Sequence, residues 1–140
     1  MAVNAKRVLI GALVGGLVWN AWSFFVNVVV LAGRYKAAQD AGSLLPQPRF
    51  AAFPAIWTVM LFVMAWIVAS LYAAARASWG AGPMTALKIG VLIGFASGVP
   101  GNFASASWGI FSRWLPLWWT LDFVIGAVLA AVIAGWLYRD

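Results

Sequence analysis

The chain has 140 residues, of which 65% are hydrophobic and 9% are charged, and its formal net charge is +6. In a typical soluble domain about a quarter of the residues are charged. A soluble domain of this size buries only about two-thirds of the surface that its unfolded chain exposes. The composition therefore excludes an ordinary soluble fold and indicates that much of the surface faces lipid.

The composition also narrows the chemistry that the chain can perform. It has no cysteine and no histidine, so it lacks the usual ligands of metals and haem and the usual general base. Its three acidic residues, Asp40, Asp122 and Asp140, are too few for a carboxylate-bridged metal centre. We therefore expect no enzyme, no metal site and no cofactor. The basic residues are spread between apolar segments, which indicates anchoring at membrane ends and no binding of nucleic acid.

Four apolar segments each approach the roughly 20 residues that a helix needs to cross a ~30 Å hydrocarbon core. Charged residues, glycines or prolines bound every segment, and no strand pattern is present. The sequence predicts an all-α integral membrane protein, a single four-transmembrane-helix bundle with spans at about residues 8–31, 53–75, 87–106 and 117–137.

An even number of spans places both termini on one side of the membrane. Lys6 and Arg7 directly precede the first span, and lysine and arginine concentrate on the cytoplasmic side of membrane proteins. We therefore expect a bacterial inner (cytoplasmic) membrane protein whose two termini are cytoplasmic. In the loop after the first span, residues 33–42 predict either two amphipathic turns at the interface or an ordinary hinge.

The ten tryptophans have two interpretations. Indole rings concentrate at both membrane–water interfaces, so an aromatic belt is the ordinary reason for them. The alternative is a stacking platform for an aromatic or isoprenoid ligand. Five tryptophans fall near the membrane end opposite the termini: Trp57, Trp108, Trp114, Trp118 and Trp119.

Polar side chains inside an apolar span are costly, so each of them needs a reason. Alternate spans run in opposite directions, which brings the polar residues of all four spans to mid-depth or to the membrane half opposite the termini. This segregation predicts one polar pocket that binds a ligand, formed by Asn20, Ser23, Asn27, Thr58, Asn102, Ser105 and Asp122.

Asp122 is the acidic residue that lies inside a span, about 7 Å from its start at 1.5 Å per residue. Its carboxyl group has three alternatives: to accept hydrogen bonds from Asn102, Ser105 or tryptophan indoles, to pair with Arg113 or Arg34, or to take up a proton. A structural role as a cap or ion pair and a role in ligand or proton binding both remain open.

Small residues four positions apart recur in three of the spans. Such residues allow helix backbones to approach closely when lipid removes the hydrophobic drive for association. We therefore assign a helix-packing role to Gly11, Gly15, Gly90, Gly94, Gly98, Gly126 and Ala130.

Three segments resemble a bacterial family of small four-span membrane proteins known as a domain of unknown function. They are the aromatic and polar end of the first span (residues 19–25, WNAWSFF), the glycine-rich third span (residues 90–95, GVLIGF) and the turn into the last span (residues 111–122, FSRWLPLWWTLD). The resemblance implies four spans and no particular activity.

Two functional hypotheses follow. The first is a non-catalytic membrane accessory or interaction subunit, in which small-residue helix faces pack against a second copy or against other membrane subunits. The second is a small transporter or a binding protein for a lipophilic ligand, such as a lipid or a quinone, that uses the polar pocket. Membrane lipids are partners in both.

Overall fold

The computed structural model describes residues 3–138, and this part of the chain is mainly helical. Four segments within it are long and apolar enough to cross a membrane: α1 with the π-helix η1 (together Ala5–Val30), α3 (Phe53–Trp79), α4 (Pro83–Trp108) and α5 (Trp114–Leu137). The prediction of an all-α, four-helix membrane bundle is confirmed. Asp140 lies outside the described residues.

The first span changes its winding before it ends. It begins as the α-helix α1 (Ala5–Phe24) and continues as the π-helix η1 (Phe25–Val30). At the end of η1 the N–H of Leu31 donates to the carbonyl of Val26, five residues back instead of four. Such π-helical turns are rare and are frequently found at functional sites.

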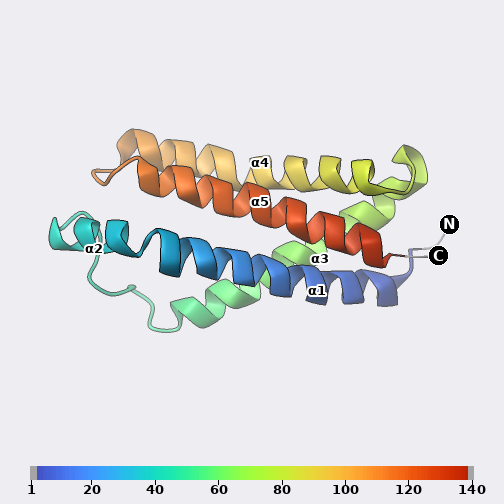
Figure 1. Ribbon diagram of the computed structural model, residues 1–140, viewed down its shortest axis with the longest axis horizontal. Helices are drawn as coiled ribbons and strands as arrows, with labels where there is room; N and C mark the ends of the chain where they lie inside the picture. The colour runs from blue at the N-terminus through green and yellow to red at the C-terminus, as the bar shows by residue number, and fades with distance from the viewer. Residues whose placement is uncertain (1–2, 139–140) are drawn as a thin grey trace.

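The helix α2 (Ala32–Asp40) follows η1 and extends beyond the ends of the membrane spans at one end of the bundle (Figure 1). Of residues 33–42, for which the sequence predicted either amphipathic turns or a hinge, residues 33–40 are helical and Ala41 and Gly42 form a turn. Residues 41–52, which include Pro46 and Pro48, form turns and bends and lead back to the start of α3. Each proline disfavours helical geometry in the residue before it, so this segment does not continue the helix α2.

Both ends of the described chain lie at the end of the bundle opposite α2 (Figure 1). The backbone N–H of Asn4 donates to the hydroxyl of Tyr138 over 2.8 Å, which joins the start of α1 to the end of α5. The bundle therefore has a terminal end and an opposite end, and the opposite end carries α2.

The helix α5 contacts each of the other three spans, and α1 also packs on α3. Glycine and alanine form much of the buried face of α5, where small side chains allow close helix contact. Gly11 and Gly15 of α1 lie against Ala134 and Ala130: a Cβ atom added to either glycine would lie 3.1 Å from the backbone of α5. On the same helix, Gly126 lies under the indole of Trp19.

The glycine row of α4 packs on the other side of α5. A Cβ atom added to Gly90 or Gly94 would lie 2.6 Å from the Cα atom of Val128 or Val124, respectively. A Cβ atom added to Gly98 would lie 2.8 Å from Cβ of Phe123. The small residues that the sequence marks for helix packing therefore lie between helices of the same chain.

Candidate ligand-binding site

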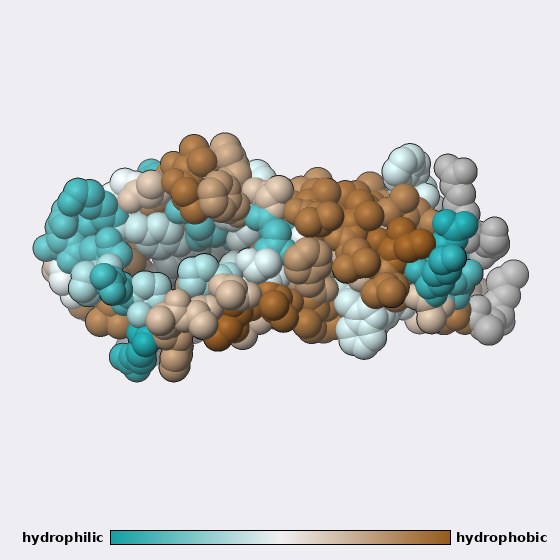
Figure 2. Space-filling view, turned by 90° about the horizontal axis from the view of Figure 1, so that it is seen from below, coloured by the Kyte–Doolittle hydropathy of each residue, from teal (hydrophilic) through white to brown (hydrophobic). Residues whose placement is uncertain are grey.

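A cavity of about 570 Å³ lies in the half of the bundle opposite the termini, between the outer parts of all four spans. Figure 2 shows a hollow on the face viewed from below, on the side that carries α2 in Figure 1. Hydrophilic residues gather on this side, whereas the middle of the molecule is strongly hydrophobic on the same face. The cavity volume falls within the range of about 300–1,000 Å³ that is typical of small-molecule sites.

Six of the seven polar residues predicted to share a pocket line this cavity: Asn20, Ser23, Asn27, Thr58, Asn102 and Asp122. Ser105 is the exception, because its hydroxyl donates to the carbonyl of Gly101 in its own helix and the residue does not line the cavity. The amide of Asn20 donates to the carbonyls of Gly16 (2.9 Å) and Thr58 (3.4 Å), which links α1 to α3.

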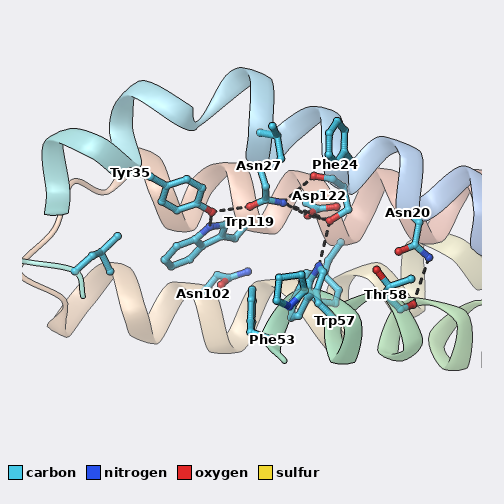
Figure 3. Close-up of a pocket in the computed structure, with 15 residues that line it drawn as sticks. Asn20, Phe24, Asn27, Tyr35, Phe53, Trp57, Thr58, Asn102, Trp119 and Asp122 are labelled. Atoms are coloured by element: carbon cyan, nitrogen blue, oxygen red, sulfur yellow. Dashed lines mark hydrogen bonds between the residues drawn. The ribbon is translucent and has the colours of Figure 1, made fainter. Parts of the chain in front are cut away.

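The carboxyl group of Asp122 is at the centre of a hydrogen-bond network (Figure 3). Its Oδ2 atom accepts from the hydroxyl of Ser23 (2.7 Å) and from the amide Nδ2 of Asn27 (3.0 Å). Both donors belong to the first span, so these bonds join that span to α5. Among the alternatives that the sequence left open, hydrogen bonds from Asn102, Ser105 or tryptophan indoles and pairing with Arg113 or Arg34 are wrong for Oδ2, whose donors in the described chain are Ser23 and Asn27.

Two chains of hydrogen bonds converge on this carboxyl oxygen, and each begins at an indole. In the first, the indole N–H of Trp119 donates to the hydroxyl of Tyr35 (2.6 Å), which donates to Oδ1 of Asn27 (2.5 Å). In the second, the indole N–H of Trp57 donates to the hydroxyl of Ser23 (3.3 Å). Each hydroxyl accepts from an indole and donates onward, so the direction of both chains is fixed toward the carboxylate.

Tyr35 connects α2 to the network. Burial raises the pKa of its hydroxyl above the ordinary value of 10.0, the hydrogen bond from Trp119 lowers it, and the nearby charge of Asp122 raises it again. At neutral pH the hydroxyl is therefore protonated and can donate to Asn27, as the geometry requires. The rings of Tyr35 and Trp119 also stack, with centroids 6.5 Å apart.

The second carboxyl oxygen of Asp122, Oδ1, is buried and has no hydrogen-bond partner within residues 3–138. The other buried side-chain atoms without a partner in that part of the chain are the indole nitrogens of Trp19 and Trp22, and neither of these residues lines the cavity. A buried acceptor that has no partner in the protein and belongs to a residue lining a cavity can accept a hydrogen bond from a bound molecule.

No lysine or arginine is present among the described residues that line the cavity. The basic residues of α2 have other contacts: Arg34 lies over the ring of Trp114, 5.7 Å from its centroid, and Lys36 pairs with Asp40 over 2.9 Å on an exposed face. Within residues 3–138 the carboxyl group of Asp122 therefore receives only uncharged donors.

Aromatic rings form much of the remaining wall. Phe53 stacks on Trp57 with centroids 5.7 Å apart, and Trp57 meets Phe123 edge-on at 5.8 Å. Phe24 and Val28 of the first span and Phe53 of α3 line the cavity and are also exposed on the outside of the bundle. The cavity therefore opens between these two helices, both of which are long and apolar enough to cross a membrane.

The sequence did not identify Tyr35 or Trp119 as members of this site. Tyr35 follows the first span in a segment that the sequence assigns to the interface, and Trp119 is one of five tryptophans at that membrane end. The spacing of eight residues gave no signal, because a continuous α-helix would place Tyr35 about 12 Å beyond Asn27 along its axis.

Comparisons of the chain with protein-family models, with curated proteins and with solved structures gave no match. The resemblance to a four-span family stays a prediction, and the class that the fold defines is a multi-pass membrane protein with a tryptophan-rich, partly polar cavity.

Proposed function

We propose that this chain is a non-catalytic membrane protein that binds an amphipathic small molecule in the cavity beside Asp122. The observation that carries the proposal is a buried carboxyl oxygen that has no partner among residues 3–138, on a residue that lines a cavity of about 570 Å³. Ligand sites are mostly apolar pockets with a few convergent polar groups, and this cavity has that composition. Its mouth between Phe24, Val28 and Phe53 supports a ligand that enters from the membrane.

The rows of small residues, from which the sequence suggested an accessory or interaction subunit, support a different conclusion. Gly11 and Gly15 pack on α5, and so do Gly90, Gly94 and Gly98. Because these faces are covered inside the chain, they stabilise the bundle itself and give no reason to propose a partner interface.

A cavity-filling variant tests the proposal. Asn102→Phe adds a ring at the cavity wall, whereas Ser105→Phe adds the same ring to the same helix outside the cavity lining. We expect the unaltered chain and Ser105→Phe, purified from their native membrane, to retain one small amphipathic molecule at about one copy per chain, and Asn102→Phe to lose it. Mass spectrometry of solvent extracts measures this. Equal recovery from all three chains, or bulk lipid alone from each, would count against a binding function.

We further propose that the protein resides in a bacterial cytoplasmic membrane with both termini in the cytoplasm, as Lys6 and Arg7 before the first span suggest. The chain has no cysteine, so single cysteines report sidedness without background. We expect a membrane-impermeant maleimide to label Ala37→Cys in intact cells and Ser78→Cys only after lysis. The reverse pattern would invert the topology and place the cavity in the cytoplasmic half.

A further inference from the structure

The carboxyl group of Asp122 is buried, with 2% of the residue exposed, and is only half satisfied. Its Oδ2 atom accepts from Ser23 and Asn27, whereas Oδ1 has no partner within residues 3–138. A carboxylate offers about four lone-pair positions, so the protein leaves part of its accepting capacity unused. Because the χ2 angle of aspartate is broad, a small rotation presents Oδ1 to the cavity that the residue lines.

The charge of this carboxylate is also uncompensated by the described part of the chain. Its donors are a hydroxyl and an amide, and the described cavity lining contains no lysine or arginine. A buried carboxylate without a counter-charge is strongly disfavoured. Protonation at Oδ1 would remove the charge but would leave a buried O–H group without an acceptor among residues 3–138. A bound cation that donates a hydrogen bond satisfies both the charge and Oδ1.

The atoms around the carboxylate select the kind of cation. A metal ion such as Ca²⁺ or Mg²⁺ requires about six or more oxygen ligands. Here Asn27 presents its Nδ2 to Oδ2, and Trp57 presents an indole N–H to Ser23. These N–H groups repel a metal ion, whereas an organic ammonium group brings N–H donors of its own.

The walls of the cavity indicate what the ammonium group is attached to. Phe53 and Trp57 stack on each other beside the carboxylate, and Trp119 stacks on Tyr35 across the cavity (Figure 3). The faces of aromatic rings attract cations and also bury apolar chains. A mouth between two helices that are long and apolar enough to cross a membrane admits a molecule with a long apolar part.

We infer that the cavity takes an amphipathic amine, whose ammonium group donates to the carboxylate of Asp122 and whose apolar body lies against Phe53, Trp57 and Trp119. This ligand class rests on the proposed binding function, because it requires that the cavity be a binding site. It goes beyond that function by excluding neutral lipids, quinones and fatty acids as the preferred ligands.

The test uses three probes that share one alkyl chain and differ in their head group: dodecylammonium, dodecanol and dodecanoate. The full chain carries Asn102→Cys at the cavity wall and is reconstituted in nanodiscs of uncharged lipid. The rate at which N-ethylmaleimide labels this cysteine, followed by mass spectrometry, reports occupancy of the cavity. Ser105→Cys, on the same helix outside the lining, is the matched control.

We expect dodecylammonium to protect Asn102→Cys at about 10- to 100-fold lower membrane concentration than dodecanol, the ratio that one hydrogen bond to a charged group supplies. Dodecanoate should not protect, and no probe should protect Ser105→Cys. Equal protection by the alcohol and the ammonium, or better protection by dodecanoate, would overturn the inference while the binding function stands. If none of the probes protects Asn102→Cys, or if both cysteines are protected equally, the binding function fails as well.

Asp122→Asn, added to Asn102→Cys, isolates the charge. An asparagine oxygen at the Oδ2 position still accepts from Ser23 and Asn27, so the fold is retained, while the charge and the free acceptor are lost. We expect this variant to bind dodecanol and dodecylammonium equally. Ser23→Ala keeps the carboxylate and should keep the preference for the ammonium, which makes it the second variant should Asp122→Asn fail to fold. If Asp122→Asn still prefers dodecylammonium to dodecanol, Asp122 is not the residue that binds the ammonium group.

Discussion

The terminal half of the bundle and the half that carries α2 use the same spans in opposite ways. In the terminal half, a Cβ atom added to Gly90 would lie 2.6 Å from Cα of Val128, which leaves no room for it, and one added to Gly15 would crowd the backbone of Ala130 at 3.1 Å. In the half opposite the termini, Gly101 of α4 has no atom within 4 Å of the position of an added Cβ, and a cavity of about 570 Å³ lies nearby. We call these parts the closed half and the open half.

The contrast shows that a glycine in a membrane helix does not by itself define a contact. The α4 row meets backbone at Gly94 and the side chain of Phe123 at Gly98, and the next residue of the row, Asn102, lines the cavity. The change occurs where an aromatic residue of α5 replaces a small one, and Phe123 is also a wall of the cavity. At this level α5 also makes side-chain hydrogen bonds to other helices, since Asp122 accepts from the first span and Trp119 donates to α2.

The strongest test of the contrast adds the same side chain in both halves. Gly94→Val places a branched side chain against the Cα atom of Val124, which cannot move away, so we expect the free energy of unfolding to fall by about 3 kcal/mol. Gly101→Val meets nothing and should change it by no more than about 0.5 kcal/mol. Unfolding in detergent by added sodium dodecyl sulfate measures both. Equal effects would show that the two halves are packed alike.

A second test removes the central link of the open half. Asn27→Leu deletes one donor to Asp122 and the acceptor of the Tyr35 hydroxyl, which keeps only its bond from Trp119, so we expect a loss of about 1–2 kcal/mol. Asn20→Leu is the matched control, because the amide of Asn20 donates only to backbone carbonyls of Gly16 and Thr58 in the described network. It should cost less than half as much in the same unfolding assay. A larger loss for Asn20→Leu would show that the network is not centred on Asp122.

The smallest effect is expected from removing one hydroxyl. Tyr35→Phe breaks the chain between Trp119 and Asn27 and should lower stability by about 0.6 kcal/mol, the average for hydrogen bonds between membrane helices. The indole N–H resonance of Trp119 should shift in this variant, since its acceptor is lost. Tyr72→Phe, which removes a hydroxyl that accepts from Gly82 in the closed half, should leave that resonance unchanged. A Trp119 resonance that responds to neither variant would contradict the hydrogen bond.

The four-helix fold and the membrane depth of the site can both be predicted from the sequence. Apolar length fixes the spans, and the alternating direction of the spans places Asn27, Asn102 and Asp122 at the same membrane depth. The sequence does not reveal which helix faces which, because glycine rows on three helices offer several pairings. The row of α4 and the row of α1 both proved to pack on α5.

The partners of Asp122 were harder to predict because they depend on rotation about the helix axis. Ser105 lies at the right depth but bonds to Gly101 of its own helix, whereas Ser23 and Asn27 face α5. Tyr35 reaches the same group only because the first span continues through η1 into α2. No hydropathy pattern encodes a π-helical turn, so this part of the site requires the structure.

The π-helix η1 has a consequence for how this site tolerates changes in chain length. Successive residues of an ordinary α-helix are rotated by about 100°, and a wider turn corresponds to one residue more than regular coiling needs. Deleting Val29 from η1 would restore regular coiling, and because the wide turn rotates each residue by less than 100°, the loss of one residue leaves the direction of Tyr35 toward Trp119 nearly unchanged. A one-residue deletion in η1 should therefore disturb the site less than the same deletion in the regular helix α1, where nothing compensates for the lost rotation of about 100°.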